Sequence, residues 1–104
     1  MKKFNTERIA LLAKELPHWR VHAEGQSMVR EFVFADFVSA FGFMTQVAMA
    51  AEKTSHHPEW FNVYNRVKVV WTTHDVQGLS QRDEDMARLC DTVFTRMQGS
   101  GHAG

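Results

Sequence analysis

The sequence has little cysteine, no net charge and no long apolar run. Its single cysteine, Cys90, has no partner for a disulfide within the chain. Its 12 lysines and arginines are balanced by 12 aspartates and glutamates, so no excess of positive charge is available for the phosphate backbone of a nucleic acid. No apolar segment approaches the ~20 residues that cross a bilayer. We therefore expect neither direct nucleic-acid binding nor a membrane span.

The residues at the two ends of the sequence suggest a compartment and a domain boundary. The first residues, MKKFNTER, lack the apolar run of a signal peptide, and a lone cysteine suits a reducing compartment. We therefore expect an intracellular, cytoplasmic protein. Residues 99–104, GSGHAG, are mostly small, and we expect them to form a flexible tail after a single domain that spans residues 1–98.

The amino-acid composition and length are typical of one folded domain. The chain has 104 residues, of which 44% are hydrophobic and 23% are charged. A chain of this size buries roughly 60–70% of the surface that it exposes when unfolded. The length leaves no room for a second domain of ordinary size.

Hydrophobic spacing in the first third of the chain predicts a helix followed by a β-hairpin. Apolar residues recur at helical spacing from Thr6 to Leu16, and Pro17 cannot continue the helix. Alternation then marks residues 19–24 as a strand, with a turn at Gly25 and a second β-rich run over residues 28–34. We expect these two strands to pair antiparallel.

A long second helix is expected after Asp36, which is a plausible N-cap. One face of this helix is predicted to be apolar and to pack in the core. The residues of this predicted face are Phe37, Ala40, Phe41, Met44, Val47, Ala48 and Ala51.

The rest of the chain completes an α+β pattern. A short strand is expected around residues 61–64 and another over residues 67–71, where Val67, Val69 and Trp71 alternate with other residues. Ser80 and Asp83 resemble a capping box that opens a third helix. The order α-β-β-α-β-β-α predicts two layers, with three helices on one face of a mainly antiparallel four-stranded sheet.

The most unusual chemistry lies in residues 56–65, HHPEWFNVYN. Glu52 precedes His56 by four residues, so a continuing helix would place its carboxylate beside that imidazole. His74 follows the strand over residues 67–71, and the sheet could bring it to the same place. Three imidazoles with nearby carboxylates would suit acid–base chemistry near neutral pH.

Other interpretations of these residues remain open. A histidine pair before proline is often only a polar loop, and Trp60, Phe61 and Tyr64 are by default packing residues. Three histidines can also form a catalytic zinc site, although their spacing here matches no familiar zinc motif. We therefore expect no metal.

Residues 52–83, EKTSHHPEWFNVYNRVKVVWTTHDVQGLSQRD, closely resemble the pterin-4a-carbinolamine dehydratase family, which includes a dimerization cofactor of a homeodomain transcription factor. The likeness extends over residues 8–97, including FADFVSAFGFMTQVAMAAEK. It implies removal of water from a 4a-hydroxytetrahydropterin to give the quinonoid dihydropterin, during tetrahydrobiopterin recycling for aromatic amino acid hydroxylases. No metal or redox cofactor is implied, because the pterin is the substrate.

The resemblance also implies a role for individual residues. His57 and His74 would be the acid–base groups, and His56 a third catalytic histidine that binds and assists. Glu52 and Asp83 would be the carboxylates that orient them. The implied substrate-binding residues are Pro58, Thr73, Asp75, Val76 and Trp19, the last as an aromatic wall.

Three further expectations concern partners and alternatives. The resemblance implies a homodimer or homotetramer, and a hydroxylase or a transcription factor as a further partner. The alternative function is a protein-binding module on the same fold. A third reading is a dehydratase of another pterin-like compound, such as one tied to molybdenum cofactor metabolism.

Overall fold

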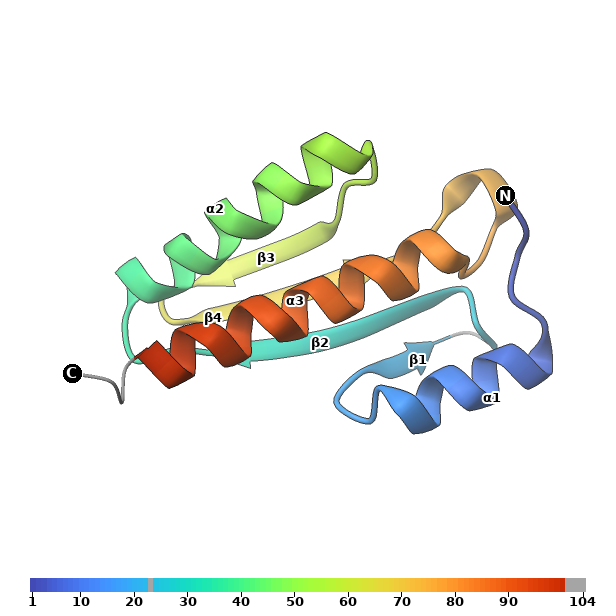
Figure 1. Cartoon of the computed structure of the whole chain (residues 1–104), viewed down its shortest axis with the longest axis horizontal. Helices are drawn as coiled ribbons and strands as arrows, with labels where there is room; N and C mark the ends of the chain where they lie inside the picture. Colours follow the sequence, from blue (N-terminus) through green and yellow to red (C-terminus); the bar gives the residue numbers. More distant parts are fainter. Residues whose placement is uncertain (23, 101–104) are drawn as a thin grey trace.

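The computed structural model describes residues 1–22 and 24–100, which form helices on one side of a four-stranded sheet (Figure 1). The elements in chain order are α1 (Thr6–Glu15), β1 (Arg20–His22), β2 (Ser27–Val33), α2 (Phe37–Thr54), β3 (Glu59–Val63), β4 (Arg66–Trp71), the 3₁₀ helix η1 (His74–Val76) and α3 (Gln81–Ser100). This order confirms the predicted α-β-β-α-β-β-α pattern and the α+β fold class.

All neighbouring strands of the sheet pair antiparallel, in the spatial order β1-β2-β4-β3. Val29 of β2 lies opposite Arg20 of β1 on one side and opposite Val70 of β4 on the other. Both α2 and α3 contact β4, and Figure 1 shows them on the same face of the sheet. The predicted two-layer arrangement with an antiparallel sheet is therefore confirmed.

Several element boundaries differ from those expected, including those of β3 and α3. The strand β3 begins at Glu59, earlier than the expected start at residue 61. The helix α3 continues through Ser100, past the expected domain boundary at residue 98. The rest of the expected tail, residues 101–104, lies outside the described residues.

Side-chain caps set where the first two helices begin. Asn5 Oδ1 accepts a hydrogen bond from Arg8 N at 2.8 Å at the start of α1. Asp36 Oδ1 accepts one from Ser39 N, also at 2.8 Å, at the start of α2. This backbone hydrogen bond lowers the pKa of Asp36 below its ordinary value. The cap predicted at Asp36 is confirmed.

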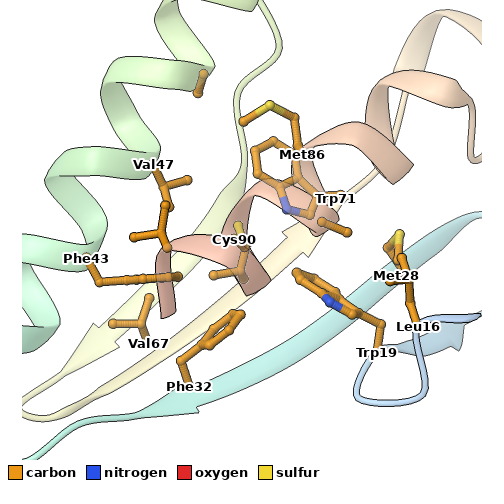
Figure 2. Close-up of a cluster of buried hydrophobic side chains, with 14 of the residues drawn as sticks. Leu16, Trp19, Met28, Phe32, Phe43, Val47, Val67, Trp71, Met86 and Cys90 are labelled. Carbon is orange, nitrogen blue, oxygen red and sulfur yellow. The ribbon is translucent and has the colours of Figure 1, made fainter. Parts of the chain in front are cut away.

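The core lies between the sheet and the helices, where the alternation of β4 places its large side chains. Val67, Val69 and Trp71 all have no exposed surface, which confirms the expected strand period. The Phe32 ring of β2 lies 4.7 Å from the Phe43 ring of α2, measured between centroids. Figure 2 shows the side chains of Phe32, Phe43, Val67 and Trp71 around Cys90 of α3.

The predicted apolar face of α2 was only partly correct. The buried residues of this helix are Ala40, Phe43, Val47 and Ala51. Phe37 and Phe41, expected in the core, are 47% and 56% exposed. Val38 and Met49 are also exposed, so the helix carries apolar side chains on more of its circumference than the sheet covers. Periodicity alone could not show which part of so wide an apolar arc would face the core.

Within residues 1–22 and 24–100, no helix is both long enough and apolar enough to cross a bilayer.

Candidate active site

The three predicted histidines lie around one hollow, where α2 and β4 end and α3 begins. Its volume is about 270 Å³. We call it the histidine hollow; its lining residues are Ser55, His56, His57, Thr72, Thr73, His74, Asp75 and Arg82. In Figure 1 the end of α2 and the loop before α3 lie at the same end of the molecule. The sheet therefore brings together residues that are well separated in the sequence.

A tight helix end separates the two adjacent histidines. Ser55 has a left-handed backbone, with φ of 56°, and its N–H donates to Glu52 O at 3.2 Å. The N–H of His56 donates to Ala51 O at 3.0 Å. This pair of bonds is a Schellman motif, which reverses the chain after a helix. As a result His56 is buried, whereas His57 remains on the surface.

The expected pairing of Glu52 with His56 was wrong. Glu52 Oε1 instead lies 2.9 Å from His57 Nε2. The prediction assumed that helical spacing continued to His56, but α2 ends at Thr54 and the left-handed Ser55 changes the direction of the chain.

His56 belongs to a buried hydrogen-bond network. Its Nε2 lies 2.7 Å from Asp83 Oδ1. Asp83 Oδ2 accepts from Ser80 N at 2.9 Å and from Thr73 Oγ1 at 2.6 Å. An ionised carboxylate can only accept hydrogen bonds, so with Asp83 ionised the His56 ring donates through Nε2–H in this contact. The imidazole also stacks on the Trp71 ring, with 5.5 Å between centroids.

The network also forms half of the predicted capping box at the start of α3. The bond from Ser80 N to Asp83 Oδ2 is the part of that motif in which an acid in the first turn accepts from the cap residue. In a complete capping box the Ser80 hydroxyl would accept from the backbone N–H of residue 83. Here Ser80 Oγ instead lies 2.7 Å from Thr73 Oγ1. Because Thr73 donates to Asp83, Ser80 is the donor in this contact. The polar side chains of this buried cluster are therefore mutually satisfied.

The other two histidines are exposed and each contacts a carboxylate. The side chain of His57 is 62% exposed and that of His74 is 80% exposed. His74 Nε2 lies 2.9 Å from Glu59 Oε2, at the start of β3. Each of the three imidazoles therefore has one carboxylate partner: Asp83, Glu52 or Glu59. A carboxylate on one ring nitrogen favours a single tautomer and orientation, which leaves the other nitrogen available for proton transfer.

The residues expected to bind substrate fall into two groups. Thr73 and Asp75 line the histidine hollow, although the Thr73 hydroxyl is already used by Asp83. Pro58 and Val76 belong to the segments that frame the hollow but are not among its lining residues.

Trp19 lies in the core and not at the hollow. It is 3% exposed, its Nε1 donates to Asp91 Oδ1 at 2.9 Å, and its ring meets Phe32 edge-on. A buried ring has no free face for a ligand in this chain, so the expected aromatic wall is not formed by Trp19. The aromatic ring that contacts a predicted site residue is Trp71.

Three residues of this region were not anticipated: Glu59, Trp71 as a stacking partner, and Arg82. Glu59 lies opposite Val70 in the β3–β4 ladder, so its position depends on a strand register that the sequence did not specify. Arg82 lines the hollow from the first turn of α3, next to Asp83. Its place beside a predicted site residue was the one available signal.

The described residues show no cluster typical of a metal centre. Within residues 1–22 and 24–100, no group of three or more histidine, cysteine, aspartate or glutamate side chains is arranged to hold a metal ion. The histidines instead contact separate carboxylates.

The fold and the hollow define a small α+β protein with clustered, carboxylate-bonded histidines. Residues 2–93 match the family described as Pterin 4 alpha carbinolamine dehydratase. The chain belongs to this family.

Similar proteins are found in several bacteria. A relative from Novosphingobium aromaticivorans, provisionally named a pterin-4-alpha-carbinolamine dehydratase, is 61% identical over 86% of this chain and 93% of its own length. Another with the same provisional name, from Rhizobium johnstonii, is 49% identical over 92% of this chain and 97% of its own length.

Solved structures show the same fold. A transcriptional coactivator/pterin dehydratase from Brucella melitensis has a TM-score of 0.85 and 39% identity, covering 88% of this chain and 98% of its own. A pterin dehydratase-like protein identified as a RuBisCO assembly factor in the alpha-carboxysome has a TM-score of 0.64 and 18% identity, covering 73% of this chain and 88% of its own. At that identity the second likeness concerns the fold alone.

Proposed function

We propose that this protein is a hydro-lyase that converts a 4a-hydroxytetrahydropterin into the quinonoid dihydropterin and water. Family membership supports the reaction class. The observation that carries the proposal is the arrangement of His56, His57 and His74 around one hollow, each with a carboxylate partner.

The reaction requires two proton transfers. The C4a–O bond breaks as the C4a=N5 double bond forms, so the leaving hydroxyl must gain a proton and N5 must lose one. An acid and a base are therefore sufficient in principle, and no atom is oxidised or reduced overall. Imidazoles, whose ordinary pKa is about 6.5, can serve in either role near neutral pH.

The three histidines differ in burial, which suggests that they have different roles in the reaction. His57 and His74 have exposed rings that a substrate in the hollow can reach, so we assign them the acid and base roles. His56 is 8% exposed and is held by Asp83 and Trp71, which suits a fixed group that binds and positions the pterin. Glu52 and Glu59 would orient the two exposed imidazoles.

Asp75 and the backbone around Thr73 and Val76 offer polar groups for the amide and amino edge of the pterin. The side chain of Asp75 lines the hollow and is exposed. A carboxylate accepts hydrogen bonds from adjacent N–H groups, as the amino edge of a pterin presents. The physiological reaction we propose is tetrahydrobiopterin recycling for an aromatic amino acid hydroxylase.

The test of this function is a stopped-flow assay. A 4a-hydroxytetrahydropterin is generated freshly, and its decay is followed by absorbance with and without the wild-type protein. We expect faster decay with the protein and the spectrum of a quinonoid dihydropterin as the product. An unchanged decay rate would reject the proposed activity.

A second function has its own supporting observation. Phe37, Val38, Phe41 and Met49 leave a broad apolar surface on α2 exposed in the single chain. Exposed apolar patches of this kind mark interaction sites. The Brucella melitensis neighbour is named both a transcriptional coactivator and a pterin dehydratase. We propose that this chain likewise has two roles, catalysis and association with a second copy or a protein partner.

A further inference from the structure

The outer side of β2 is only partly covered by β1. The pairing of these two strands ends at Arg20 opposite Val29, whereas β2 continues to Val33. On its other side β2 is paired with β4 along this whole stretch. Figure 1 shows β2 extending past the start of β1, and no other strand of residues 1–22 and 24–100 lies along that side. The last residues of β2 therefore form a free strand edge.

The hydrogen bonds of β2 show which backbone groups face this free edge. Phe34 N–H donates to Asn65 O at 2.8 Å, which places the backbone groups of Phe34 on the β4 side. Bonding groups alternate between the two sides of an antiparallel strand, so those of Glu31 and Val33 point away from β4. No loop backbone group of the described residues is bonded to them. The N–H and C=O groups of both residues are therefore open to a further strand.

A hollow beside the free edge is lined by several basic residues. Its volume is about 460 Å³, and we call it the basic hollow; its lining residues are His18, Arg20, Val29, Arg30, Glu31 and Lys68. Two of the charged groups are neutralised within the chain. Arg30 Nη1 donates to Asp91 Oδ1 at 2.6 Å, and Arg66 Nη1 donates to Glu31 Oε1 at 3.0 Å. The only acidic side chain of the lining is therefore already paired.

Arg20 and Lys68 supply the uncompensated charge of the basic hollow. In the part of the chain that the structure describes, neither side chain forms a salt bridge. Arg20 lies opposite Val29, which lies opposite Val70 of β4. Lys68 is two positions before Val70 in the same strand, so its side chain shares this face of the sheet. Val69 points to the opposite face and is buried in the core. The positive charge therefore lies on the face that the helices leave open.

The free edge and the basic hollow together indicate a peptide and not a small anion. A small anion would contact Arg20 and Lys68 but would leave the backbone of Glu31 and Val33 unpaired. A peptide in an extended conformation pairs with both, because an exposed strand edge supplies main-chain hydrogen bonds while neighbouring side chains supply specificity. The net positive charge of the lining favours acidic side chains on the added strand.

We propose that the free edge of β2 binds an extended acidic segment of a partner protein, which is added to the sheet as a strand in line with β1. This surface is separate from the histidine hollow and from the exposed apolar residues of α2. The inference therefore goes beyond the proposed function and does not depend on it.

The experiment measures the binding of a fluorescent peptide in which valine alternates with glutamate, by fluorescence anisotropy. One comparison peptide has lysine in place of glutamate, and another has every backbone nitrogen methylated, which removes its N–H donors and keeps its charge. We expect saturable binding of the glutamate peptide to the wild type and at least about tenfold weaker binding of both comparison peptides. The backbone amide signals of Glu31 and Val33 should shift in NMR spectra when the glutamate peptide is added.

Variants of the protein test the edge and the charge separately. Val33→Pro removes an outward N–H, and proline is tolerated on an edge strand at such a position. It should raise the Kd by at least about threefold, the effect of one lost hydrogen bond. The matched control, Val33→Thr, keeps the N–H and should bind as the wild type does. The double variant Arg20→Gln, Lys68→Gln should raise the Kd by about twofold to thirtyfold.

Several results would overturn the inference. Among them are no binding of the glutamate peptide by the wild type, equal binding of either comparison peptide, and full affinity in a folded Val33→Pro. Amide shifts confined to α2 or to the histidine hollow would also reject this surface. A smaller assembly of Val33→Pro in light scattering would show that the edge pairs copies of this chain instead. If Val33→Pro does not fold, the methylated peptide still decides, because it is tested on the wild type.

Discussion

His56 Nε2 lies 2.7 Å from Asp83 Oδ1, and this contact joins the segment after α2 to the first turn of α3. Asp83 has no exposed surface, and its carboxylate also accepts from Thr73 and Ser80. Burial of a carboxylate is costly unless its oxygens are hydrogen-bonded, and here each oxygen has at least one donor. The same residues therefore support both the fold and the histidine hollow.

Replacing Asp83 by alanine should destabilise the protein strongly. The change leaves the His56 imidazole, the Thr73 hydroxyl and the Ser80 N–H without their acceptor. Removal of one partner of a buried pair typically lowers the free energy of unfolding by about 3–5 kcal/mol, which urea denaturation would measure. The control is Asp85→Ala, an exposed acid on the same helix, expected to change it by less than about 1 kcal/mol. Equal stability of the two variants would contradict the account of the network.

The stability contributed by Asp36 should depend on pH. Its pKa is lowered from 3.8 in the folded protein by the bond from Ser39 N–H, so the charged form favours folding. This contribution is complete above the ordinary pKa and is lost as the pH falls through the lowered value. Asp36→Asn keeps a capping oxygen that does not titrate. The difference in Tm between wild type and Asp36→Asn should be constant near neutral pH and should change below about pH 4. A difference independent of pH down to pH 2 would count against the cap.

The exposed face of α2 should mediate self-association. Phe41 is 56% exposed, so Phe41→Asp should preserve the fold of the chain while placing a charge in an apolar contact. Light scattering at micromolar concentration should show a dimer or tetramer for the wild type and a smaller assembly for Phe41→Asp. The control is Gln46→Asp on a polar part of α2, which should keep the wild-type mass. A monomeric wild type would contradict this prediction.

Cys90 should be unreactive in the folded protein. Burial raises the pKa of its thiol to about 12, and the thiolate is the reactive form. Alkylation at pH 8 should therefore be at least about 100-fold slower in the native protein than in urea, as followed by mass spectrometry. Similar rates in the two conditions would show that the thiol is accessible without unfolding.

The fold was largely predictable because its signals are periodic. The alternation of Val67, Val69 and Trp71 marked a strand whose alternate side chains are buried, and Asp36 marked a helix start. The core face of α2 was predicted less well. Its apolar residues occupy a wide arc, so the buried position of Phe43 depends on how the helix lies on the sheet.

The candidate site was predictable in its residues but not in its pairings. The resemblance identified the three histidines, and the structure places them around one hollow. The partner of His57 depends on the left-handed backbone at Ser55. A serine rarely adopts this conformation, so the sequence did not predict it. The partner of His74 depends on the register of β3 against β4, which places Glu59 beside the His74 side chain. Both pairings arise from tertiary geometry.

The most direct test of the central claim is the decay rate of a freshly generated 4a-hydroxytetrahydropterin in the presence of wild-type protein, His57→Ala, His74→Ala and His22→Ala. His22 is an exposed histidine in β1 that does not line the histidine hollow, so it is the control for loss of an imidazole. We predict acceleration by the wild type and by His22→Ala, and a loss of at least ~100-fold in turnover for each of the other two variants. A spontaneous rate unchanged by the wild type, or full turnover by His57→Ala and His74→Ala, would contradict the assignment of this hollow as a dehydratase site.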